Sequence, residues 1–349
     1  MSFVLASQHQ IAALLQDGDV AALLSTKADL DSIVTFEIEL AHSQAALRLI
    51  PVEAAKAIAQ AAPAATWDMG KLTEAMQKDG VIVPGLLEQL KPQMPADARS
   101  HLHFGVTSQD AVDTSLMLRA RKICAHVKSE VQRVVHAIEN LSRKFGAKPL
   151  MAQTRMQAAL PIKVRDRLMM WRQAYSDSNA ALEKLIFPLQ LGGPVGTLDK
   201  FGADAAALRS ELSRRLGLHD PGHSWHANRT AIADLAQAFN LVSAAGGKFG
   251  ADLLLMAQSD RQAIKLKGGG GSSSMPHKRN PVEAEALVAL ARFNAVQSGG
   301  INLALVHEQE RSGTSWTLEW MLLPQMLLAG AASARSAHMI LENVEAIGE

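Results

Sequence analysis

The sequence predicts an all-α protein built from long helices. Apolar residues recur at steps of three and four over segments several turns long, which is the spacing of one helix face. Alanine, leucine and methionine are abundant, and aromatic residues make up only 4% of the chain, a composition that favours helices over sheets. Because long helices joined by compact loops pack as bundles, we expect a long helical bundle and no regular strands.

The clearest predicted helix runs from Asp110 to Leu141, with Val127, Val131 and Val134 among the residues on its apolar face. At 1.5 Å per residue it would be roughly 45 Å long. The other helices are expected at about 31–49, 53–61, 161–186, 228–265, 282–310 and 317–345. Clusters of glycine, proline and serine predict loops at about 145–150, 188–203, 219–224, 268–281 and 312–316.

The chain divides by pattern into two parts. Residues 1–105 are expected to form a smaller helical N-terminal domain, and residues 106–349 the central long-helix bundle domain. Some of the predicted helices carry apolar residues on more than one face, as in ADLLLMA at 251–257. A monomer would expose part of that surface, so we expect an oligomer.

Bulk properties exclude several classes of function. The chain has 349 residues, 48% hydrophobic content and a net charge of +1, so no strong field points to nucleic acid or a membrane surface. Its one cysteine, Cys124, and an N-terminus without signal-peptide features favour a cytoplasmic setting. The sequence contains no metal-ligand cluster and no dinucleotide fingerprint, so we expect neither a metal nor a cofactor.

HFGVTSQDAVDT, residues 103–114, predicts the start of the longest helix. Thr107 and Asp110 have the spacing of a capping box. Free N–H groups at a helix start, the hydroxyls of Thr107 and Ser108 and the amide of Gln109 could together bind a carboxylate or phosphate. A helix cap without further function explains the same residues, so both interpretations stay open at this point.

MAQTRMQAALPIKVRD, residues 151–166, is a second polar stretch. It places Thr154, Arg155 and Gln157 ahead of a proline that is typical of a helix start. The stretch could be a polar loop that ends in a cap. Alternatively, Arg155 could hold a carboxylate through two parallel hydrogen bonds.

WHANRTAIADLA, residues 225–236, puts His226 and Arg229 about one turn apart at the expected start of another helix. The two residues could form a surface pair or an anion site. LGGPVGTLDKFG, residues 191–202, is rich in glycine, and tight turns alone explain its composition.

GGGGSSSMPHKRNP, residues 268–281, is the most specific stretch. Its glycines allow the backbone to swing, Ser272 and Ser273 offer hydroxyls, and Lys278 and Asn280 follow at the entry to the next helix. The residue orders of a P-loop and of a nucleophile elbow are both missing. From the residues alone, a flexible linker and a mobile functional loop fit equally well.

Residues 271–281, GSSSMPHKRNP, resemble the signature loop of the fumarase/aspartase superfamily, G-S-S-x-M-P-x-K-x-N-P. TSQD and TRMQAALP lie where the first two conserved regions of that superfamily belong, so the resemblance covers about residues 30–349. It implies a helical bundle, a homotetramer with active sites shared between subunits, and a small C-terminal domain that is largely absent from this sequence.

Within the superfamily, HFGVTSQDAVDT, QLGGPVGTLDKFG and WHANR are most similar to the bacterial 3-carboxy-cis,cis-muconate cycloisomerases. That group implies lactonisation of a tricarboxylate in the protocatechuate branch of aromatic degradation. Adenylosuccinate lyases are the alternative group, because they too tend to read M-P-H-K-R-N-P. A sulfonated muconate as substrate and a non-enzymatic, crystallin-like scaffold are further alternatives.

Arg155 departs from the superfamily pattern, in which a histidine follows the threonine of the second region and works with a glutamate, here Glu285. An amine or hydroxide leaving group needs a proton donor, whereas a lactone releases a carboxylate, whose conjugate acid has a pKa of ~4. Arginine stays protonated and cannot replace that histidine. It could pair with Glu285 or hold a substrate carboxylate. The departure therefore favours cycloisomerisation over amine or water elimination.

The resemblance also implies roles for individual residues. Ser272, or otherwise Ser273, would move the proton at the substrate α-carbon, and Lys278 and Glu285 would complete the catalytic set. The expected substrate-binding residues are Thr107, Ser108, Gln109, Thr154, Arg155, Gln157, His226, Arg229, Met275 and Asn280.

Overall fold

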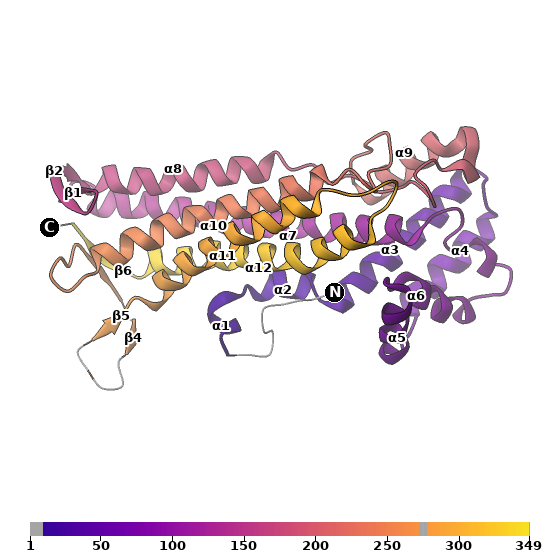
Figure 1. Ribbon diagram of the computed structural model, residues 1–349, viewed down its shortest axis with the longest axis horizontal. Coiled ribbons are helices and arrows are strands. Elements are labelled where there is room, and N and C mark those ends of the chain that lie inside the picture. Colours follow the sequence, from indigo (N-terminus) through magenta and orange to yellow (C-terminus); the bar gives the residue numbers. More distant parts are fainter. Residues whose placement is uncertain (1–9, 268, 272–274, 276–277, 349) are drawn as a thin grey trace.

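The computed structural model describes residues 10–267, 269–271, 275 and 278–348, and it has the predicted all-α architecture. Five long helices run side by side along the longest axis of the molecule (Figure 1). They are α7 (Ser108–Phe145), α8 (Val164–Glu183), α10 (Thr230–Met256), α11 (Val282–Ala304) and α12 (Gly313–Glu342). The valines predicted on the apolar face of α7 are buried, which confirms the period that predicted this helix.

The other helices lie along and beyond this bundle (Figure 1). They are α1 (Ala12–Leu15), α2 (Gly18–Leu23), α3 (Thr26–Ala46), α4 (Val52–Ala61), α5 (Met69–Asp79), α6 (Val83–Leu90) and α9 (Ala205–Leu216). The 3-10 helices are η1 (Ala62–Ala64), η2 (Lys91–Gln93), η3 (Arg99–His101) and η4 (Asp199–Asp204). Helices α4 to α6 gather at one end of the bundle (Figure 1). The division into domains at residue 105 stays a prediction.

Three small antiparallel sheets were not predicted. Strand β1 (Pro149–Thr154) pairs with β2 (Gln157–Lys163), β3 (Ile264–Leu266) with β6 (Val344–Ile347), and β4 (Gly270–Gly271) with β5 (Arg279–Asn280). The helices predicted at 161–186 and 228–265 were therefore too long, since α8 begins at Val164 and α10 ends at Met256. Cross-strand hydrogen bonds hold residues 161–163 and 264–265 extended, and residues 257–263 form the turn that follows α10. Helix propensity does not account for such cross-strand pairing.

Helices α10 and α11 pack closely at the end of the bundle that carries β4 and β5. A Cβ atom added to Gly250 would lie 2.7 Å from the carbonyl oxygen of Ala284 on α11, so glycine permits this approach. The close contact holds the first turn of α11 against α10, near the ladder of β4 and β5.

Several large apolar side chains lie on the surface of the described chain. They include Met156, Leu160, Met169 and Met170 near β2 and α8, and Val296, Leu303 and Val306 on or just after α11. Separately, no helix in the described ranges is long and apolar enough to cross a bilayer.

Candidate active site

The predicted capping box begins α7. Thr107 is the N-cap, and its backbone N–H donates to Oδ2 of Asp110 at 3.0 Å. The half-buried Thr107 and Ser108 therefore stand where a helix presents free N–H groups. This confirms the cap, while the predicted role in binding an anion stays a prediction.

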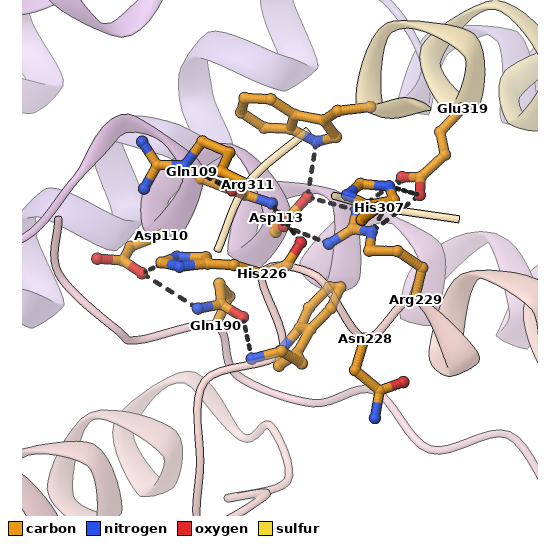
Figure 2. A network of polar contacts seen from close by, with 12 residues as sticks. Gln109, Asp110, Asp113, Gln190, His226, Asn228, Arg229, His307, Arg311 and Glu319 are labelled. Carbon is orange, nitrogen blue, oxygen red and sulfur yellow. Dashed lines mark hydrogen bonds and ion pairs between the residues drawn. The ribbon is translucent and has the colours of Figure 1, made fainter. Parts of the chain in front are cut away.

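Asp110 does more than cap the helix. Its carboxylate is fully buried and accepts from the backbone N–H groups of Gly192 at 2.8 Å and Gly193 at 2.9 Å. Nε2 of His226 lies 2.9 Å from Oδ1, and the amide of Gln190 donates to the same oxygen at 3.2 Å (Figure 2). One carboxylate thus ties the glycine-rich loop and the WHANR segment to the first turn of α7.

Arg229, the residue before α10, forms the centre of a buried ionic network. The network reaches α7 at Asp113, one turn after Asp110. Its guanidinium donates to Asp113 at 2.6 and 3.0 Å and to Glu319 of α12 at 2.7 Å, and its side chain is fully buried (Figure 2). Burial alone would lower the pKa of Arg229, but the charges and hydrogen bonds of Asp113 and Glu319 raise it. The surface-pair interpretation of His226 and Arg229 is wrong, since both side chains are buried.

His307 and Arg311, like Glu319, lie far from the α7 start in sequence and were not predicted. His307 lies against Glu319, with Nε2 and Oε1 3.2 Å apart. Arg311 donates from Nε to Oε1 of Gln109 at 2.9 Å and from Nη2 to the carbonyl oxygen of Pro194 at 3.1 Å. The exposed Arg311 is thereby held beside the start of α7, where its remaining donors can reach an anion.

His103, just before the cap, pairs with α3. Its Nδ1 lies 2.6 Å from Oε1 of Glu37, whose side chain is buried. Burial by itself would lower the pKa of His103, but the charge and hydrogen bond of Glu37 outweigh it, and the net effect raises the pKa above 6.5. The pair fastens the segment that leads into Thr107.

The 268–281 loop lies at the other end of the bundle. Gly270 pairs with Asn280 and Gly271 with Arg279, so the two sides of the loop meet in a short ladder at its base. The backbone N–H of Lys278 donates to the carbonyl oxygen of Met275 at 3.0 Å. Ser272 and Ser273 lie outside the described residues.

A groove of about 940 Å3 adjoins this loop base and collects three of the predicted site residues. Lys278, Asn280 and Glu285 line it, together with Lys265 and the last turn of α10. Glu285 lies in the first turn of α11, where the helix dipole favours a carboxylate. The structure thus brings the predicted lysine, amide and glutamate to one surface.

Thr154, Arg155 and Gln157 lie in the hairpin of β1 and β2. The predicted cap is present at the end of this stretch, where Asp166 accepts from the backbone N–H of Lys163 at 2.8 Å, but the helix begins at Val164 and not at Pro161, which belongs to β2. Thr154 pairs with Gln157, so Arg155 and Met156 form a two-residue turn. All three predicted residues are exposed. Arg155 lines a second, smaller hollow against α8 and α10, and Glu285 is absent from the described lining of that hollow.

The predicted residues therefore form two groups at opposite ends of one chain. Arg229 immediately precedes α10, whereas the loop groove and the hollow beside Arg155 both include residues of its last turns. The 27 residues of α10 rise by about 40 Å. A small molecule cannot contact both groups within one chain.

Among the described residues, one group of side chains has the composition of a metal site. Asp17, Asp19 and His126 lie together near α2. Nε2 of His126 is 3.2 Å from Asp17 and its Nδ1 is 3.9 Å from Asp19. The imidazole bridges the two carboxylates with different nitrogens, which is the geometry of an ion pair.

A family model described as lyase matches residues 22–294. The chain is 31% identical over 344 residues to the 3-carboxy-cis,cis-muconate cycloisomerase of Bradyrhizobium diazoefficiens, over 96% of this chain and 76% of that protein. It is 32% identical over 340 residues to the nitrosuccinate lyase of Streptomyces davaonensis, which covers 92% of this chain and 71% of that protein.

The fold agrees with a solved structure. The β-carboxy-cis,cis-muconate cycloisomerase of Acinetobacter calcoaceticus matches with a TM-score of 0.91 and 27% identity, over 97% of this chain and 78% of that one. The long-helix bundle, the capping box at Thr107 and the lysine–asparagine–glutamate groove therefore occur in a chain that belongs to the lyase family, the fumarase/aspartase superfamily that residues 271–281 resemble.

Proposed function

We propose that the chain is a cycloisomerase that interconverts 3-carboxy-cis,cis-muconate and a carboxymuconolactone. One observation carries the choice of this reaction over amine or water elimination: by the resemblance to the superfamily, Arg155 occupies the place of a proton-donating histidine. No histidine lines the loop groove or the hollow beside Arg155 in the described part of the chain. A reaction whose leaving group is a carboxylate needs no proton donor there. The relatives named as cycloisomerases support the same choice.

In the proposed reaction, one substrate carboxylate adds to a carbon–carbon double bond and closes a five-membered lactone ring. The displaced electron pair moves to the carbon α to another carboxylate, where it forms an aci-carboxylate. A proton then reaches that carbon. In the reverse direction a base removes this proton, and the ring oxygen leaves as a carboxylate.

The charge that develops on the aci-carboxylate requires fixed cations and N–H donors. We assign this role to Lys278 and Asn280 from the loop groove, and to Thr107 and Ser108 at the start of α7. Ser272 is the first candidate for the proton-transfer group and Ser273 the second. Lys267 and Lys278 flank these two serines in the sequence, and a nearby ammonium lowers the pKa of an acid.

The remaining predicted residues divide between binding and positioning. We assign substrate carboxylates to Arg155 and Arg311, with Thr154, Gln157 and Met275 completing the pocket and Glu285 retained in the catalytic set. Gln109, His226 and Arg229 already bond to protein partners, so we assign them to positioning of the α7 start. This assignment explains why the buried network surrounds the cap.

The proposed site requires more than one copy of the chain, because its two groups lie about 40 Å apart along α10. Exposed apolar side chains on α8 and α11 offer surface for such an assembly. We propose a homotetramer in which the α7 start of one subunit meets the loop groove of another.

A second candidate is β-elimination of a weakly basic leaving group from a substituted succinate. The relative named nitrosuccinate lyase is as similar in sequence as the cycloisomerases. Nitrite, like a carboxylate, is a stable anion that can depart without a proton donor. The same replacement by Arg155 is therefore compatible with this reaction.

A substrate panel separates these reactions. Purified protein is given 3-carboxy-cis,cis-muconate, 3-sulfomuconate, adenylosuccinate and nitrosuccinate, and loss of each is followed by absorbance with products identified by NMR. We expect rapid loss of 3-carboxymuconate with lactone as the product. Faster turnover of nitrosuccinate or adenylosuccinate would overturn the proposal, and no turnover of any compound would indicate a non-enzymatic scaffold.

A further inference from the structure

The hollow beside Arg155 is a concentrated cationic pocket. It has a volume of about 300 Å3 and lies between the β1–β2 turn, α8 and the end of α10. Arg155, Arg167, Lys248 and Arg261 line it with a single carboxylate, Asp252. Four cations against one anion leave a net of three positive charges around a space the size of a small molecule.

Asp252 cannot neutralise the arginines, because its charge is already engaged. Its Oδ2 accepts from the indole of the buried Trp171 at 2.7 Å and pairs with Lys248 at 2.5 Å. Arg155 and Arg261 have no side-chain hydrogen bond or ion pair with any residue in the described ranges. Guanidinium groups collected without carboxylates are typical of sites for oxyanions, which they bind in bidentate fashion.

The pocket is separate from the loop groove. Lys248, Asp252 and Met256 follow one another at single turns of α10 and line the pocket from one face of the helix. Leu254 and Ala257 line the loop groove from the opposite face of the same helix. An anion in the pocket would therefore not contact Lys278 or Glu285 of the same chain.

The β1–β2 turn places Arg155 at a conformational cost. Arg155 and Met156 have φ values of 47° and 67°, as in the two-residue turns that normally use asparagine and glycine. Neither arginine nor methionine favours positive φ values, so the backbone shape of the turn does not explain why these two residues occupy it. Unfavourable backbone geometry of this kind often accompanies a functional side chain.

We propose that Arg155, Arg167 and Arg261 form a binding site for a small multivalent oxyanion, a polycarboxylate or a phosphate. Three guanidinium groups can engage more than one anionic group at once, which favours multivalent over monovalent ligands. The anion is either a carboxylate arm of the substrate or a separate ligand that modulates the enzyme. Binding of such an anion can be measured without turnover, so the site can be tested independently of the proposed reaction.

Calorimetric titration with citrate, inorganic phosphate and acetate tests this site at low ionic strength. We expect citrate or phosphate to bind at one site per chain and acetate to bind much more weakly. Arg261→Gln and Arg167→Gln should each weaken binding about tenfold or more. Arg172→Gln is the matched control, because Arg172 lies on the same helix as Arg167 but pairs with Glu139 outside the pocket.

Thermal unfolding verifies that each variant is folded, and Arg261, which lies after the end of α10, can be replaced without touching a helix. Absence of binding by both multivalent anions would overturn the proposal. The proposal would also be overturned if binding survives Arg261→Gln and Arg167→Gln but is lost in Lys278→Met, because the anion would then occupy the loop groove.

The two sources of the anion are separated by kinetics. If the pocket holds a substrate carboxylate, Arg261→Gln raises KM in proportion to the loss of citrate binding. If it holds a separate ligand, KM stays unchanged while citrate binding is lost and citrate no longer alters turnover. Both outcomes support the site. Should no substrate be turned over, the titration still decides the proposal alone.

Discussion

Arg229 and Asp113 form a bidentate ion pair from which solvent is excluded: both side chains are fully buried, and their hydrogen bonds measure 2.6 and 3.0 Å. Glu319 closes the other side of the guanidinium at 2.7 Å. The pair joins α7 to the start of α10, and Glu319 joins both to α12. This network connects three helices one turn after Asp110, close to the predicted substrate-binding residues at the α7 start.

Replacement of Arg229 by methionine should lower the free energy of unfolding by about 3–5 kcal/mol, because two buried carboxylates lose their counter-charge. Arg172→Met is the control, since its pair with Glu139 is exposed and should contribute about 0–1 kcal/mol. Urea denaturation of both variants measures the difference. Equal losses in the two variants would contradict the buried network as described.

The His103–Glu37 pair predicts a pH dependence of stability. Because the pKa of His103 is raised in the folded state, the pair's contribution is complete below about pH 6.5 and is lost as the pH rises through the raised pKa. Wild type should therefore exceed His103→Gln in unfolding free energy by more at about pH 6 than at about pH 9. Asp110 supports the charged imidazole and Lys91 opposes it. A difference that is constant or larger at high pH would contradict the pair.

Asp110→Asn should be more damaging than an ordinary loss of a helix cap. The amide removes an acceptor that holds Gly192 and Gly193 in place, at a cost of roughly 1–3 kcal/mol for the buried groups left unpaired. Asp166→Asn is the matched control, because Asp166 caps α8 in the same way but is exposed, and its loss should cost about 1 kcal/mol or less. Chemical denaturation compares the two. A smaller loss for Asp110→Asn would show that the glycine loop does not depend on it.

The sequence predicted the parts of the fold that local patterns encode. The valine period of α7 and the Thr107–Asp110 spacing both reflect interactions within a few residues, and both were confirmed. The β1–β2 hairpin was missed because its strands, PLMAQT and QAALPIK, contain few β-branched and no aromatic residues, and its Arg155–Met156 turn lacks the usual asparagine–glycine signal.

The candidate site was only partly predictable for a different reason. Glu319 lies 90 residues after its partner Arg229, and Arg311 lies 202 residues after its partner Gln109. No local sequence pattern relates residues that far apart. Asp113 was within reach, since it follows Asp110 by three residues and so shares a helix face with it. The positions of Ser272 and Ser273 relative to the groove stay predictions.

Ser272→Ala should lower the turnover of 3-carboxymuconate by about 10²–10⁴-fold if this serine transfers the proton, since general acid–base groups contribute factors of that size. Steady-state kinetics on the folded variant measures the loss. Ser273→Ala is the comparison on the same loop and should retain most activity. Near-normal turnover in Ser272→Ala would remove this residue from the mechanism.

The shared site predicts complementation between two inactive variants. Lys278→Met alters the loop groove, and Arg311→Met alters the α7 start at the other end of the bundle; both side chains are exposed. Each variant alone should be nearly inactive, because every site contains one altered group. In mixed tetramers, some sites receive the intact Lys278 from one chain and the intact Arg311 from another.

The decisive measurement is the rate at which 3-carboxymuconate absorbance is lost in an equal mixture of Lys278→Met and Arg311→Met after dissociation and reassembly. A shared cycloisomerase site predicts that the mixture recovers a substantial fraction of wild-type turnover, well above the sum of the separate variants. A mixture as inactive as its components, beside an active wild type, would contradict the shared site; an inactive wild type would contradict the proposed reaction itself.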